Sequence, residues 1–311
     1  MKPGPETDNI QKLQQDIVNT FSTIKKSSYE AGTCKRVFRL PNNIALAVTH
    51  GSAGMEKDLI FNEQIYLNYL KEQGYPVVSM RGQVFAVEEE GKAIRYGYLM
   101  DYIPDAVFIE TKSPALLKAQ IYAALLGIPT HPSEGWWGIN HSRIFNVIST
   151  MLQDPETFKE VQISAATLVQ NYKNLIAKLR KDSLAISDLQ MMLSKDGTLT
   201  IIDPLDVVRV DPKNNQLISI ADPTRPPDAG FRDFLLRTND WLNEGFKIAH
   251  TITSAANPEH LQTLAGTAKP EATTFKPLMN RHIRQVQAST ARSGQDKAEP
   301  RTLPSRKKPQ Q

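Results

Sequence analysis

Cysteine is nearly absent from this chain, and so are several other features that would place it in a class of proteins. Cys34 is the only cysteine in 311 residues, so no disulfide can form within the chain. The six histidines show no metal-ligand spacing, which argues against a structural zinc site. No stretch approaches the roughly 18 uninterrupted apolar residues of a membrane span, and no secretory signal peptide is visible. We therefore expect a protein of a reducing compartment with no transmembrane segment.

Positive charge is scarce outside the C-terminal end. From Gly266 onward there are ten Lys/Arg and three Asp/Glu, a net charge of +7, so residues 1–265 carry −3 of the total of +4. A nucleic-acid-binding domain would carry basic residues on the fold itself, and we expect no specific nucleic-acid partner. Composition predicts a basic, disordered tail over residues 258–311. Its Arg306-Lys307-Lys308 cluster either contacts an anionic surface or only keeps the chain soluble.

Apolar periodicity predicts an α+β fold. A polar leader, residues 1–28, contains one amphipathic helix from Ile10 to Ile24. Residues 29–103 are rich in strands, and residues 104–257 are mainly helical. The predicted strands are 34–40, 44–48, 77–80, 84–87 and 94–100, with turns at 41–43, 81–82 and 90–91 and a helix at 57–73. The later helices are 114–126, 158–179 and 231–252, with loops at 127–141 and 211–230.

An acidic hairpin is the feature that points most directly to chemistry. The segments Ile186–Gln190 and Leu199–Asp203 are apolar runs with a Lys195-Asp196-Gly197 turn between them. This pattern predicts a β-hairpin that presents Asp188 and Asp203 from neighbouring strand ends. Such a pair suits phosphoryl transfer, in which one carboxylate orients the attacking hydroxyl and the other holds Mg²⁺ against the phosphates.

Taken in order, these elements resemble the two-lobed protein kinase-like fold, with a small β-rich N-lobe and a mainly helical C-lobe. Gly32, within Tyr29–Phe38, looks like the surviving glycine of a nucleotide-covering loop. Glu63 stands where the partner of the ATP-binding lysine is expected. Asp188 matches the catalytic-loop aspartate, and Asp203-Pro204-Leu205 resembles the metal-binding Asp-Phe-Gly triplet.

The resemblance also implies ligands. Leu99–Ile103 is similar to the hinge between lobes, so the backbone of Asp101, Tyr102 and Ile103 would bind adenine. The implied cofactors are ATP and Mg²⁺, with Mn²⁺ as a substitute.

Two departures from the family pattern concern its most important residues. Ala47 stands where the strand lysine belongs, and Lys35 on the preceding strand resembles the relocated lysine of the with-no-lysine kinases. Lys35 would then hold the phosphates, paired with Glu63; the alternative is a solvated edge-strand lysine in a dead site. Leu193 stands where a second metal-binding residue, an asparagine, is expected, and Gln190 is the nearest amide that could replace it.

Three functions follow as hypotheses. The first is an atypical ATP- and Mg²⁺-dependent kinase that transfers the γ-phosphate to a protein hydroxyl. It resembles reduced kinases that bacteria secrete into host cells, so we expect it to be cytoplasmic, or secreted into a host without a Sec-type signal. The second is a pseudokinase, a binding module that uses the same two lobes to hold a partner or a nucleotide without catalysis. As a separate alternative for the hairpin, Asp188 and Asp203 are only turn residues. The third is a small-molecule phosphotransferase of the aminoglycoside or choline type, against which stands the lack of an acidic cluster for a cationic substrate.

Overall fold

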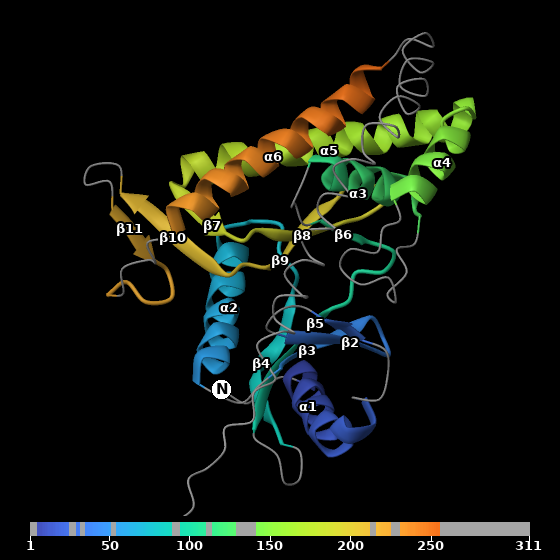
Figure 1. Ribbon diagram of the computed structural model, residues 1–311. Coiled ribbons are helices and arrows are strands. Elements are labelled where there is room, and N and C mark those ends of the chain that lie inside the picture. The colour runs from blue at the N-terminus through green and yellow to red at the C-terminus, as the bar shows by residue number, and fades with distance from the viewer. Residues whose placement is uncertain are drawn as a thin grey trace, which may run out of the picture. The chain divides into compact units, whose positions relative to one another are not determined.

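The computed structural model describes residues 5–24, 29–31, 35–50, 54–88, 94–109, 114–128, 141–211, 216–224 and 231–255. Gly32, Cys34 and the predicted tail, 258–311, lie outside the described residues, as does the predicted turn at 90–91. The elements that position the candidate site come from both the strand-rich and the helix-rich parts of the chain (Figure 1). No described helix is long and apolar enough to cross a membrane.

A five-stranded antiparallel sheet forms the N-terminal part, with the strand order β1-β2-β3-β5-β4. Its strands are β1 (Tyr29–Ala31), β2 (Lys35–Leu40), β3 (Ile44–Thr49), β4 (Met80–Val87) and β5 (Arg95–Asp101). The predicted turn between β2 and β3 is confirmed. Three residues join Leu40 to its partner Ile44, and two of them, Asn42 and Asn43, have positive φ, which asparagine tolerates better than most residues.

Two helices cover opposite faces of this sheet (Figure 1). Helix α1 (Pro5–Ile24) buries Ile17 and Phe21 against one face, and helix α2 (Gly54–Glu72) buries Ile60 and Leu67 against the other. Successive residues of a strand point to opposite faces, so β2, β3, β4 and β5 contribute side chains to two separate apolar clusters, one on each face. Helix α2 ends before Gly74, whose φ of 75° suits the left-handed position after a helix.

The remainder is mainly helical. It contains α3 (Pro114–Leu126), α4 (His141–Met151), α5 (Pro155–Lys181) and α6 (Phe231–Ser254), with α5 and α6 packed side by side (Figure 1). Two three-stranded sheets join them, with orders β11-β10-β7 and β6-β8-β9. Their strands are β6 (Val107–Ile109), β7 (Leu184–Ser187), β8 (Gln190–Leu193), β9 (Leu199–Asp203), β10 (Asp206–Asp211) and β11 (Gln216–Ser219).

The predicted fold class is confirmed: the protein is α+β, with a β-sheet part followed by a mainly helical part. Three details were wrong. The predicted turn at 81–82 lies inside β4, where the register with β5 shifts and Gly82 adopts a φ of 77°. The predicted strand 77–80 reduces to a parallel bridge between Val77 and Ile201. The loop predicted for 211–230 contains strand β11.

Candidate functional site

Three side chains from three elements surround the ammonium of Lys35, which comes from a fourth. Lys35 on β2 lies 2.5 Å from Glu63 Oε1 on α2 and 2.9 Å from Asp203 Oδ1 at the end of β9. It also donates to the Tyr98 hydroxyl on β5, at 3.2 Å. That hydroxyl in turn donates to Glu63 Oε1 at 2.5 Å. The side chain of Lys35 is 12% exposed, so it is not a solvated edge-strand lysine.

Strand register explains why these groups share one face of the sheet. Lys35 is opposite Thr49, and two residues further along β2 Val37 is opposite Ala47. Ala47 is in turn opposite Tyr98 on β5. Cross-strand partners point to the same face, and so do residues two apart on one strand. Lys35, Ala47 and Tyr98 therefore all project towards α2, which supplies Glu63.

Burial and the neighbouring charges shift the pKa values of the groups in this cluster. Burial lowers the pKa of Lys35, but the carboxylates of Asp203 and Glu63 outweigh it and hold that pKa well above its ordinary value. Burial raises the pKa of Glu63 to about 7, against the opposing effect of Lys35. Burial together with the Glu63 charge raises the pKa of Tyr98 well above its ordinary value, so the hydroxyl keeps its proton. The cluster is one ammonium held by two carboxyl groups and a neutral phenol.

An antiparallel hairpin does present Asp203, but its first strand is β8 and not the predicted segment Ile186–Gln190. Ile186 and Ser187 belong to β7, which pairs with β10 in the other three-stranded sheet. Gln190 is directly opposite Asp203 in the register, which brings the two predicted metal ligands to neighbouring positions. Asp188 lies between β7 and β8 with a φ of 45°, and its Oδ2 accepts a hydrogen bond from Gln190 Nε2 at 2.9 Å. The side chain of Leu193 has no atom that could bind a metal, and it is completely buried in the core.

Asp203 and Gln190 offer a carboxylate and an amide oxygen, the donor types that Mg²⁺ accepts. Within the described residues, no group of three or more His, Cys, Asp or Glu side chains could hold a metal ion. Asp206, another carboxylate close in sequence, accepts a 2.8 Å hydrogen bond from the Tyr66 hydroxyl on α2. The Asp203 carboxylate and the Gln190 amide oxygen would fit a cation whose remaining coordination comes from phosphate oxygens and water.

The predicted hinge is partly occupied by contacts within the protein. The Asp101 backbone N–H donates to Ser79 O at 2.9 Å, and the Tyr102 N–H donates to Asn43 O at 2.8 Å. The Asp101 carboxylate pairs with Arg81 at 2.6 Å. A nucleobase could therefore use the Asp101 and Tyr102 N–H groups only by displacing these bonds. This leaves the Ile103 backbone as the better placed of the predicted adenine contacts.

Sequence reasoning missed Tyr98. It lies between Gly97 and Leu99 in a buried strand, where an aromatic residue is an ordinary core side chain. The pattern held no signal that its hydroxyl would reach Lys35 and Glu63.

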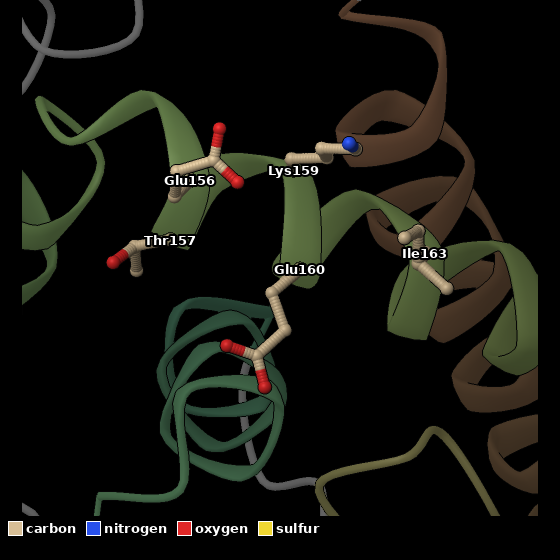
Figure 2. Close-up of a pocket in the computed structure, with 5 residues that line it drawn as sticks. All are labelled: Glu156, Thr157, Lys159, Glu160 and Ile163. Carbon is tan, nitrogen blue, oxygen red and sulfur yellow. The ribbon is translucent and has the colours of Figure 1, made fainter.

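A surface hollow of about 360 Å³ lies elsewhere, along the first turns of α5 (Figure 2). It is lined by Glu156, Thr157, Lys159, Glu160 and Ile163, all from that one helix. None of the predicted site residues lines it. We favour the Lys35 cluster as the site because its charged groups converge and two of them, Lys35 and Glu63, are largely buried. The hollow is bordered mainly by exposed side chains of a single helix.

Comparison with known proteins gives structural neighbours only. No family model matches the sequence, and no curated protein matches it. Among solved structures, a microcompartment-associated aminopropanol kinase is 12% identical with a TM-score of 0.29, covering 82% of this chain and 94% of that chain. Choline kinase LicA from Streptococcus pneumoniae is 14% identical with a TM-score of 0.26, covering 82% and 98%. Amicoumacin kinase hAmiN, in complex with AMP-PNP, Ca²⁺ and Ami, is 14% identical with a TM-score of 0.29, covering 78% and 80%. At these TM-scores the superpositions carry no argument about activity.

Proposed function

We propose that the protein is an ATP-dependent phosphotransferase of the protein kinase-like type, with its lysine supplied by β2. The observation that carries this proposal is the buried ammonium of Lys35 between Glu63, at 2.5 Å, and Asp203, at 2.9 Å. An ammonium anchored by a helix carboxylate and adjacent to a second, metal-binding carboxylate is the arrangement that phosphoryl transfer requires. The lysine need not come from any particular strand, because only the position of its charge matters.

Each residue has a distinct part in this proposal. Lys35 binds the nucleotide phosphates, and Glu63 keeps its ammonium in place. Asp203 holds Mg²⁺ with the amide oxygen of Gln190, and the metal neutralises charge that builds up on the phosphates. Asp203 is 30% exposed at its side chain, so it can be reached from solvent. Asp188, bonded to Gln190, orients the acceptor hydroxyl.

We infer a protein hydroxyl as the acceptor, as for a kinase secreted by a bacterium into a host cell. A cationic small molecule would need convergent carboxylates beyond those bound to the metal, and the sequence of the helix-rich part shows no acidic cluster for it. A binding module without catalysis is the second candidate. It is favoured by Leu193, which is buried where a further metal ligand is expected.

The test is transfer of labelled γ-phosphate from ATP with Mg²⁺ or Mn²⁺. The purified protein is incubated alone, with a eukaryotic lysate, and with aminoglycosides and choline. We expect transfer to protein, and its loss in Lys35→Met and Asp203→Ala by a factor on the order of 10²–10³. MgATP binding by calorimetry without transfer to any acceptor would instead establish the binding module.

Two further variants separate the roles of the carboxylates. Asp188→Ala should abolish transfer while nucleotide affinity stays unchanged, because Asp188 acts on the acceptor. Lys159→Met, on the exposed start of α5, is the matched control for Lys35→Met. Transfer that survives in Lys35→Met would refute the relocated lysine, and no binding of nucleotide by the wild-type protein would refute the proposed function.

A further inference from the structure

The Tyr98 hydroxyl makes two hydrogen bonds in the interior, and both go to the ion pair. It accepts from Lys35 Nζ at 3.2 Å and donates to Glu63 Oε1 at 2.5 Å. The residue is 0% exposed. A buried hydroxyl without partners costs free energy, so a tyrosine chosen only for packing would gain nothing over phenylalanine here. The two bonds indicate that the hydroxyl contributes something specific to the pair.

Tyr98 completes the coordination of the ammonium. A lysine ammonium has three N–H donors. Glu63, Asp203 and Tyr98 supply three oxygen acceptors, from α2, β9 and β5 respectively. Three acceptors on three elements fix the ammonium in position, whereas a single carboxylate would let it rotate on its flexible stem. If a phosphate oxygen takes the place of Asp203, Glu63 and Tyr98 still hold the other two donors.

The position of Tyr98 is linked to the missing lysine on β3. Ala47 is the direct cross-strand partner of Tyr98 and is 0% exposed. A lysine at 47 would project from the same face towards α2, into the space that the Tyr98 and Lys35 side chains now share. Alanine leaves that space open, so the tyrosine hydroxyl and the relocated lysine together fill it.

We propose that Tyr98 is a positioning residue that holds the Lys35 ammonium against Glu63 and directs it to the phosphate side of the site, compensating for the absent lysine of β3. The part of this inference that concerns the phosphates rests on the proposed function. The part that concerns the contact with Glu63 does not. The same hydrogen bond opposes the rise that burial causes in the pKa of Glu63, because a donor to a carboxylate favours ionisation.

The test is Tyr98→Phe, which keeps the ring and removes only the hydroxyl. We expect MgATP affinity to fall about 10- to 100-fold, the range for losing a hydrogen bond to a charged group. The acidic limb of the affinity–pH profile should also move to higher pH, since the pKa of Glu63 rises when the hydrogen bond is lost. Tyr172→Phe is the matched control. Tyr172 is also fully buried, and its hydroxyl has no hydrogen-bond partner in the structure as described.

A second measurement separates this inference from the proposed function. Carboxyl-carbon NMR of the nucleotide-free protein, assigned with Glu63→Gln, gives the pKa of Glu63 directly. A higher pKa in Tyr98→Phe than in the wild type and Tyr172→Phe supports the positioning role, even if the wild type binds no nucleotide. An unchanged Glu63 pKa, or an unchanged affinity–pH profile in a protein that binds MgATP, would overturn it.

Discussion

The two faces of the five-stranded sheet are built from the same strands and differ in chemistry. The face under α1 buries an apolar cluster, in which Phe38, Leu46 and Leu99 pack against helix residues such as Phe21. Arg36, opposite Val48, projects from the same face at its margin. The face under α2 carries the buried Lys35–Glu63 pair among small and aromatic side chains, including Ala45 and Ala47. Alternate residues of β2, β3 and β5 therefore either pack against α1 in an apolar cluster or face the charged site beside α2.

The difference shows how a charged site is kept in a small sheet. Burying charges costs free energy, and a buried ion pair often contributes nothing net to stability. Apolar burial on the opposite face can offset that cost without approaching the charges. Helix α1 is thus part of the folded core.

The strongest way to test this division is to damage the α1 face alone. Phe21 is 1% exposed and its ring lies 6.0 Å from that of Phe38, in an edge-to-face arrangement. Phe21→Ala should cost roughly 3–5 kcal/mol of unfolding free energy, measured by urea denaturation. MgATP affinity of the folded fraction should not change. Lys12→Ala, on the exposed side of the same helix, is the control. A loss of affinity in folded Phe21→Ala would show that the faces are coupled.

Local patterns predicted the parts of the site that depend on neighbouring residues. The turn at 195–197 and the apolar runs beside it predicted the hairpin that presents Asp203. The strand–turn–strand pattern placed Lys35 on β2, and the helical pattern placed Glu63 on α2. Their proximity depended on the resemblance to kinases, because no local rule brings residues 28 positions apart within 2.5 Å.

The missed elements depend on distant pairing. Strand β6 has three residues and pairs with β8, far along the chain, so it gives almost no local signal. Strand β11 lies within the segment predicted as a loop, and it is held there by its pairing with β10. Helix α4 begins directly after a Pro-, Gly- and Trp-rich segment, which drew the prediction towards loop. The hydroxyl contacts of Tyr98 and Tyr66 depend on tertiary packing and could not be read from spacing.

The charged face should make the unfolding free energy of the protein depend on pH. The pKa of Glu63 is about 7 in the folded protein against an ordinary 4.5, so the native state binds the extra proton between these values. The stability contributed by Glu63 is therefore fully present below about pH 4.5 and is lost by about pH 7, a change on the order of 3 kcal/mol. Glu63→Gln, which cannot titrate, should become more stable relative to the wild type over this window.

The measurement is a series of urea denaturations of both proteins from pH 4 to pH 8. The difference between the two unfolding free energies isolates Glu63 from the other titrating groups. Phe21→Ala serves as the comparison from the apolar face, since its difference from the wild type should not vary with pH. A flat difference for Glu63→Gln would mean that Lys35 fully offsets the effect of burial on the pKa of this carboxyl, and a difference of opposite slope would mean that Lys35 outweighs burial.

The smallest expected effect concerns how α2 is joined to the helix-rich part of the chain. Tyr66, 3% exposed, donates a 2.8 Å hydrogen bond to Asp206 at the start of β10. Tyr66 is three residues after Glu63, so this bond anchors the stretch of helix that holds the ion pair. Tyr66→Phe should cost about 1–2 kcal/mol in urea denaturation. Tyr69→Phe, which loses only an exposed 3.2 Å bond from Arg209, should cost less. If Tyr66→Phe also weakens MgATP binding while Phe21→Ala does not, then contacts across α2, and not across α1, set the geometry of the charged face.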